Sequence, residues 1–115
     1  MTIRSIIDTG NPEAVAISAL NRSSLSYRAL RNHCDQIGRQ LASQGLSNSD
    51  RVAIVLPNGP EMASAFLAVA SYMSAAPLNP NYKQSEYAFY LEDLKPGLVV
   101  VAENSTNPVR AAAMD

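Results

Sequence analysis

Few side chains in this sequence are of the types that carry out chemistry, and the first candidates are the neighbours His33 and Cys34. A cysteine and a histidine that contact each other can form a nucleophilic thiolate–imidazole pair. Adjacent residues of a helix, however, point about 100° apart, so these two side chains would not face each other. We therefore interpret Cys34 as a thiol of the core and His33 as an imidazole at the surface.

Glu92 and Asp93 form a second candidate pair, because two carboxylates can act as general acid and general base. Such groups must converge on one substrate, and adjacent helical positions converge badly. A solvated acidic surface is the simpler interpretation. Met62 and Met73 share one face of a predicted helix, and we interpret them as core residues rather than as contacts to a cofactor.

Two loops could bind a ligand without supplying a catalytic group. Residues 58–61, Asn-Gly-Pro-Glu, open a predicted helix whose free amides could hold an anion, although Glu61 would repel it. Residues 79–83, Asn-Pro-Asn-Tyr-Lys, combine turn-forming residues with the charge of Lys83. Spacing alone assigns no chemistry to either loop. No residue is therefore predicted as catalytic, cofactor-binding or metal-ligating.

The motifs that mark many nucleotide and hydrolytic sites are missing. The sequence has no G-x-x-x-x-G-K-[ST] loop, and its five glycines are too widely separated for G-x-G-x-x-G. It also lacks G-x-S-x-G and H-E-x-x-H. One cysteine and one histidine cannot build a tetrahedral zinc site without carboxylates or a second chain.

The elements that must position these residues follow from the hydrophobic pattern. Strands are predicted at residues 13–18, 24–25, 52–56, 75–78 and 98–102, and helices are predicted to begin at or near Ser26, Pro60, Ser85 and Val109. The runs 52–56 and 98–102 are apolar without alternation, which is typical of strands covered on both faces. Strands that alternate with helices imply crossover connections, so the predicted fold class is α/β with a mostly parallel sheet.

The composition limits the classes of function. With 115 residues, 47% of them apolar and 17% charged, the chain is long enough for one globular domain. Its net charge of −1 argues against a nucleic-acid partner or a polybasic membrane surface. A single cysteine excludes an internal disulfide and fits a reducing compartment. No apolar run reaches the roughly 20 residues of a membrane span, and no signal peptide or other targeting signal is recognised. The expected location is the cytoplasm.

A series of short segments follows the order and spacing of one enzyme family: LSYxxL at 25–30, DRVAI at 50–54, LPNGPE at 56–61 and AFLA at 65–68. The series resembles the amino-terminal part of the AMP-forming acyl-CoA synthetases. They belong to the adenylate-forming family, which also includes luciferases and the adenylation domains of peptide synthetases. APLNPNYK at 76–83 and EYxFYLxDLK at 86–95 are most similar to the oxalate–CoA ligases of fungi and plants.

The resemblance implies a parent enzyme that adenylates a carboxylate with ATP and Mg²⁺ and then transfers the acyl group to CoA. It assigns residues 13–115 to an incomplete synthetase domain, as its first subdomain, and residues 1–12 to an amino-terminal extension. The family's Ser/Thr/Gly-rich ATP loop ending in Pro-Lys and its other ligand-binding residues match no position here. The chain by itself is therefore expected to hold no cofactor and to catalyse neither step. The acyl substrate stays open, as does the peroxisome as a compartment for a full-length parent.

A second hypothesis comes from a different class, a non-catalytic interaction module. An incomplete α/β domain exposes sheet edges and apolar faces. These surfaces could pack on the remainder of the domain or bind a second copy of the chain.

Overall fold

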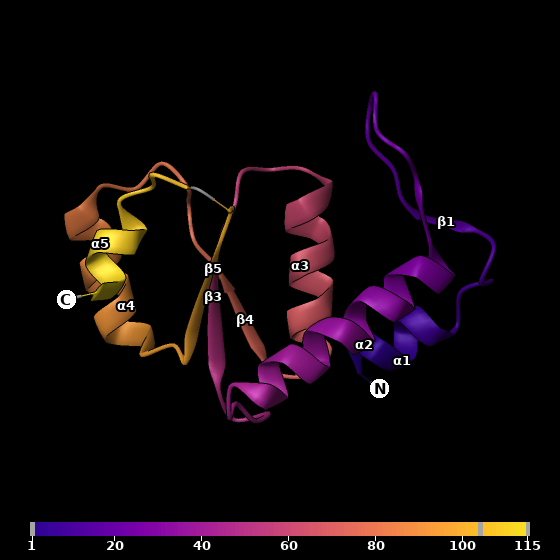
Figure 1. Ribbon diagram of the computed structural model, residues 1–115, viewed down its shortest axis with the longest axis horizontal. Coiled ribbons are helices and arrows are strands. Elements are labelled where there is room, and N and C mark those ends of the chain that lie inside the picture. The colour runs from indigo at the N-terminus through magenta and orange to yellow at the C-terminus, as the bar shows by residue number, and fades with distance from the viewer. Residues whose placement is uncertain (1, 104, 115) are drawn as a thin grey trace.

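The alternation of strands and helices is the organising feature of the computed structural model, which describes residues 2–103 and 105–114 (Figure 1). The elements in chain order are α1 (Ile3–Asp8), β1 (Val15–Ile17), β2 (Leu25–Ser26), α2 (Tyr27–Ser43), β3 (Arg51–Val55), α3 (Pro60–Ala70), β4 (Ser74–Pro77), α4 (Gln84–Leu94), β5 (Leu98–Val101) and α5 (Val109–Met114). The predicted α/β fold class is confirmed. The sequence pattern did not predict α1.

Three parallel strands in the order β4-β3-β5 form the central sheet. The chain leaves β3 through α3 to reach β4, then returns through α4 to reach β5 on the other side of β3. Figure 1 shows α3 on one face of the sheet and α4 with α5 on the other. Because both faces carry helices, β3 needs apolar residues at successive positions, which explains its unbroken apolar run.

The side chains of β3 and its carboxyl end divide between two core clusters. Val52, Ile54 and Leu56 pack with residues of α2 and α3 on one face, whereas Val55 packs with Tyr87 of α4 and Val109 of α5 on the other. Val52, Ala53 and Ile54 have 0% of their surface exposed. Burying a valine or isoleucine side chain stabilises the fold by about 1.5–3 kcal/mol relative to leaving it in water. The burial of β3 therefore makes it the centre of the core.

The strands β1 and β2 do not join the central sheet. They pair antiparallel with each other and form a two-stranded sheet, with Val15 opposite Ser26 and Ile17 opposite Leu25. A parallel connection needs a crossover of a dozen or more residues, and the segment 18–24 between these strands is too short for one. A third core cluster, Ile7, Leu30, Cys34 and Ala68, joins this region to α1, α2 and α3.

Helix ends lie close to the predicted caps. The Ser26 hydroxyl accepts the N–H of Ala29 at 3.1 Å, and Gly45 follows α2 with the left-handed φ of +81°. Pro60 is the first residue of α3, as expected for a residue without an N–H. Phe66 in the middle of α3 is 37% exposed, so part of the apolar surface of this helix does not face the core. Within the described residues, no helix has the length and apolarity required to cross a membrane.

Candidate functional site

Both loops singled out in the sequence lie at the carboxyl edge of the parallel sheet. The loop after β3 contributes Asn58, the loop after β4 contributes Pro80 and Asn81, and the loop after β5 contributes residues 105–107. Together they line an open hollow of about 620 Å³. Ligands of open α/β sheets bind outside the carboxyl ends of the strands, at the point where the connections diverge. This hollow, called the carboxyl-edge hollow below, is therefore the candidate site.

Neutral hydrogen bonds hold the loop after β4. The side-chain oxygen of Asn79 accepts the N–H of Asn81 at 2.8 Å, which fixes a turn around Pro80. The hydroxyl of Tyr87 in α4 donates to the carbonyl oxygen of Asn79 at 2.7 Å. Tyr87 is 0% exposed, so its ring anchors the loop to the core while its hydroxyl fixes the backbone of the loop.

Asn107 joins two of the three loops. Its side-chain nitrogen donates to the carbonyl oxygen of Pro80 at 2.8 Å, and its side-chain oxygen accepts the N–H of Val109 at 2.9 Å. One amide thus ties the loop after β5 to the loop after β4 and caps the start of α5. Asn107 was not predicted as a site residue from the sequence, although an asparagine followed by Pro108 just before a helix is a recognisable capping signal.

The described residues around the hollow can hydrogen-bond but cannot act as an acid, a base or a strong nucleophile. They are Val55, Pro57, Asn58, Pro80, Asn81, Ala102, Ser105, Thr106 and Asn107. None of these side chains is a carboxylate, imidazole, thiol or amine. The arrangement can position a ligand or a neighbouring domain, and it offers no group to move a proton.

The amino end of α3 carries its own negative charge. Glu61 lies in the first turn, and its carboxylate pairs with the guanidinium of Arg22 from the turn between β1 and β2. The hydrogen bond from Arg22 lowers the pKa of Glu61, helped by the backbone amide of Glu61 itself. An anionic ligand at this helix end would meet an ion pair rather than a free carboxylate, so Arg22 offsets the repulsion expected from the sequence.

The structure separates His33 from Cys34. Cys34 is 0% exposed in the cluster with Ile7, Leu30 and Ala68, whereas His33 is half-buried at a hollow beside Gln40 and Gln44. Burial raises the pKa of the Cys34 thiol, so the sulfur stays protonated and is a poor nucleophile. A core thiol and a surface imidazole describe these residues better than a catalytic pair.

The remaining candidates take no part in the site. Glu92 and Asp93 are exposed on α4, as a solvated acidic surface requires. Met62 and Met73 pack against the core cluster of Leu41 and Val69. Among residues 2–103 and 105–114, no group of three or more His, Cys, Asp or Glu side chains is placed to hold a metal ion.

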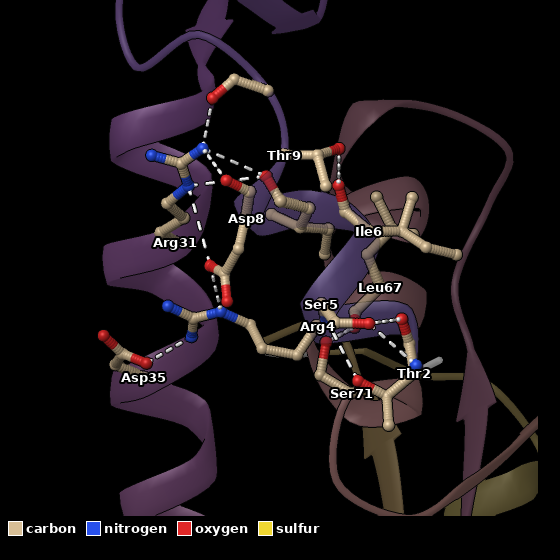
Figure 2. Close-up of polar contacts among 12 residues, drawn as sticks. Thr2, Arg4, Ser5, Ile6, Asp8, Thr9, Arg31, Asp35, Leu67 and Ser71 are labelled. Atoms are coloured by element: carbon tan, nitrogen blue, oxygen red, sulfur yellow. Dashed lines mark hydrogen bonds and ion pairs between the residues drawn. The ribbon is translucent and has the colours of Figure 1, made fainter.

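A charged cluster far from the hollow docks α1 onto α2, and we call it the α1 clamp: Arg4, Asp8, Arg31, Asp35 and Tyr72. Figure 2 shows Arg4 between Asp8 and Asp35, with Arg31 at the end of α1. Arg4 bonds Asp8 at 3.0 Å and also pairs with Asp35, which accepts the hydroxyl of Tyr72 at 3.3 Å. The hydrogen bond from Arg4 lowers the pKa of Asp35. Arg4 and Asp8 are four residues apart, as are Arg31 and Asp35, but the contacts that join the two pairs to each other and to Tyr72 connect distant positions, so spacing gave no signal for the cluster.

Arg31 closes the carboxyl end of α1. Its guanidinium donates to the carbonyl oxygens of Ile7 at 3.2 Å and of Asp8 at 3.0 Å, and also to that of Gly10. The last carbonyls of a helix lack partners within the helix. The carbonyl oxygen of Ile7 also accepts the N–H of Gly10 at 3.3 Å, whereas those of Asp8 and Gly10 gain their donor from Arg31. The clamp is structural, and it lies outside the candidate site.

Comparisons with known proteins show which family this sequence resembles. The sequence profile of the family described as AMP-binding enzyme matches residues 8–115. The oxalate–CoA ligase of Arabidopsis thaliana is 32% identical over 104 residues, which cover 89% of this chain and 20% of that protein. The oxalate–CoA ligase of Saccharomyces cerevisiae is 48% identical over 58 residues, which cover 50% of this chain and 11% of that protein.

A solved structure shows the same fold. ATP-bound MatB from Rhodopseudomonas palustris superposes with a TM-score of 0.85 and 24% identity, over 99% of this chain and 24% of that one. The chain spans no more than a fifth of the length of the curated relatives that it matches.

Proposed function

The chain belongs to the AMP-binding enzyme family, and from this premise we propose that it forms the amino-terminal portion of an acyl-CoA synthetase of the oxalate–CoA ligase type. The proposal takes residues 13–115 as part of the synthetase domain and residues 1–12 as an extension that docks through α1. The whole enzyme would adenylate a carboxylate with ATP and then form a thioester with CoA. The match of residues 8–115 to the family is the observation that carries this proposal.

Similarity to relatives supports the choice of oxalate–CoA ligases within the family. Two of them, from a plant and a fungus, are similar to this chain, and the fungal protein is 48% identical over 58 residues. The segments 76–83 and 86–95, which resemble oxalate–CoA ligases, contain the loop after β4 and the helix that anchors it. We infer that this part of the chain shapes one wall of the site in the whole enzyme.

The residues present do not fit ATP and Mg²⁺. A triphosphate needs cationic side chains, a metal ion or an array of backbone amides to balance its charge. The described lining of the carboxyl-edge hollow has no cationic and no anionic side chain, and the amino end of α3 carries Glu61. We infer that this chain frames the site, and that on its own it catalyses neither step.

A segment exchange tests the proposal. Residues 8–115 would replace the matching segment of the Arabidopsis oxalate–CoA ligase, and oxalyl-CoA formation from oxalate, ATP and CoA would be measured. We expect the hybrid to remain active on oxalate. A folded hybrid that releases no AMP with oxalate, or that prefers another acid to oxalate, would contradict the proposed type.

Two controls accompany the exchange. The same hybrid with Tyr87→Ala, which removes the anchor of the loop after β4, should lose activity. The isolated 115-residue chain, assayed beside the intact relative, should release no AMP. Measurable AMP release by the isolated chain would show that it contains the chemistry we assign to the rest of the enzyme.

The proposal also includes the cytoplasm as the compartment of this chain. The unpaired thiol of Cys34 is compatible with a reducing environment. Imaging of the tagged chain tests the compartment, and a peroxisomal or secreted signal would contradict it.

A further inference from the structure

The sequence contains one asparagine that is directly followed by a glycine, Asn58–Gly59, in the loop that joins β3 to α3. Asparagine is one of the thermolabile residues of proteins. Its side-chain amide can react with the backbone nitrogen of the next residue, and a glycine in that place favours the reaction because it has no side chain to obstruct ring closure. This pair is therefore a place where the chain can modify itself.

The fold leaves both reacting groups accessible. Asn58 and Gly59 are exposed, and Asn58 lines the carboxyl-edge hollow. In the part of the chain that the structure describes, neither the side-chain amide of Asn58 nor the N–H of Gly59 has a hydrogen-bond partner. Gly59 takes part in α3 through its carbonyl oxygen, which accepts the N–H of Ala63 at 3.1 Å. The reaction of these two groups therefore breaks no hydrogen bond of the described fold.

The other described asparagines of this edge are protected by the residues that follow them. Asn79 and Asn107 each precede a proline, whose nitrogen carries no hydrogen and cannot act as the nucleophile. Asn81 precedes the bulky Tyr82, whose N–H donates to the carbonyl oxygen of Asn79 at 3.4 Å. Among the described asparagines around the hollow, Asn58 alone combines a small following residue with an N–H that makes no hydrogen bond.

We propose that Asn58 is a site of spontaneous deamidation, which places a negative charge in the carboxyl-edge hollow. The nitrogen of Gly59 loses its proton to water and bonds to the side-chain carbonyl carbon of Asn58. The side-chain nitrogen leaves as ammonia, with a proton from water, and a cyclic imide remains. Water then opens the imide. Cleavage at the former side-chain carbonyl gives aspartate, and cleavage at the backbone carbonyl gives isoaspartate.

Both products change the candidate site. Each replaces a neutral amide by a carboxylate, whereas the described lining of the hollow has no charged side chain. The new charge lies just before the amino end of α3, where the helix dipole favours a negative charge. Isoaspartate also adds one carbon to the backbone ahead of Pro60, the first residue of α3. An anion that approaches the hollow of a deamidated chain meets a repulsion that the lining of the unmodified chain does not present.

Peptide mass spectrometry of the folded 115-residue chain, incubated at neutral and at mildly alkaline pH, tests the proposal. We expect the acid to accumulate at position 58 about tenfold faster than at position 81, because glycine lowers the barrier to ring closure. The rate should rise with pH, because the attacking nitrogen must lose its proton. Asn58→Gln keeps a neutral amide but would have to close a larger ring, so the same peptide of this variant should stay unmodified.

Two further measurements make the outcome decisive. Circular dichroism shows that the chain stays folded during incubation, and a parallel incubation in urea exposes every asparagine. Equal rates at positions 58 and 81 of the folded chain, or modification of Asn58 in urea alone, would overturn the proposal. Chromatography separates aspartate from isoaspartate, and we expect both. Aspartate without isoaspartate would also overturn the proposal, because the amide would then be hydrolysed directly rather than attacked by Gly59.

Discussion

The carboxyl-edge hollow and the α1 clamp are held together by opposite kinds of interaction. At the hollow, Asn79, Tyr87 and Asn107 form hydrogen bonds between neutral groups. In the clamp, Arg4 and Arg31 bind carboxylates and the carbonyl oxygens at the end of α1. The chain uses charge to hold its structure together and leaves the candidate site uncharged. Such a site can position a ligand or a partner domain, but the groups that perform chemistry must come from elsewhere.

The comparison has a measurable consequence for stability. Neutral buried hydrogen bonds respond little to salt or to pH. Exposed ion pairs weaken as the salt concentration rises and as the pH falls low enough to protonate the carboxylate. Variants at the hollow should therefore show the same loss of stability at low and high salt. Variants of the clamp should show losses that shrink as salt rises.

Replacement of Tyr87 should have the largest effect. Tyr87→Ala removes a fully buried ring from the core of α4 and α5, and we expect a loss of about 3–5 kcal/mol in the free energy of unfolding. Tyr87→Phe keeps the ring and removes only the hydrogen bond to Asn79, so its loss should be about 1 kcal/mol. Urea unfolding at two salt concentrations measures both. Equal losses for the two variants would contradict the division between ring and hydroxyl.

Replacement of Arg31 should come next. Arg31→Ala leaves the carbonyl oxygens of Asp8 and Gly10 without their donor, and we expect a loss of about 2 kcal/mol together with release of α1. Arg31→Lys keeps the charge but not the forked geometry, so it should recover part of the loss. Hydrogen exchange of α1 reports the release directly. Unchanged protection of α1 in the alanine variant would show that the apolar contacts of Ile7 are enough to keep α1 docked without Arg31.

Replacement of Asn107 at the hollow is the counterpart of the Arg31 replacement in the clamp. Asn107→Ala removes the donor to Pro80 and the acceptor for Val109, and we expect a loss of about 1–2 kcal/mol that does not depend on salt. Asn107→Ser keeps an oxygen that can cap α5 and loses the donor to Pro80, so it should cost less. A loss for Asn107→Ser as large as that for Asn107→Ala would argue that the cap contributes nothing.

The smallest effect should be the dependence of stability on pH through Asp35. Arg4 lowers the pKa of Asp35 below its ordinary value of 3.8, so the folded state holds the ionised form more strongly than the unfolded state does. The resulting stabilisation is present above that ordinary value and is lost as the pH falls through the lowered pKa. Because Asp35 is 45% exposed, solvent screening keeps the gain below about 1 kcal/mol.

A single variant isolates the Asp35 contribution. Asp35→Asn should flatten this part of the pH profile of unfolding. High salt should flatten it in the unsubstituted chain as well. An unchanged profile in Asp35→Asn would assign the acid sensitivity to other carboxylates.

The parts of the fold that local patterns determine were predictable from the sequence. The apolar runs became β3 and β5, of which β3 is buried and β5 is half-buried, and Ser26 and Pro60 begin their helices as expected. The two candidate loops were also identified, and their convergence follows from the rule that parallel strands end at one edge. The local sequence therefore predicts most of the strands, the helix starts and the two loops.

The parts that depend on tertiary contacts were not predictable. Helix α1 has only six residues, too few to be stable alone, and it forms because Ile7 is buried and the clamp holds its end. Arg4, Asp35 and Tyr72 meet from three distant positions, which no spacing rule connects. The separate pairing of β1 with β2 likewise follows from a short connection rather than from the apolar pattern.

Sequencing of the transcript beyond codon 115 tests the central claim most directly, because the claim is that this chain frames a site whose chemistry lies in later residues. We predict that the reading frame continues into a Ser/Thr/Gly-rich loop that ends in Pro-Lys. A stop codon directly after Asp115 would contradict the claim. The function would then have to be sought in what this domain binds.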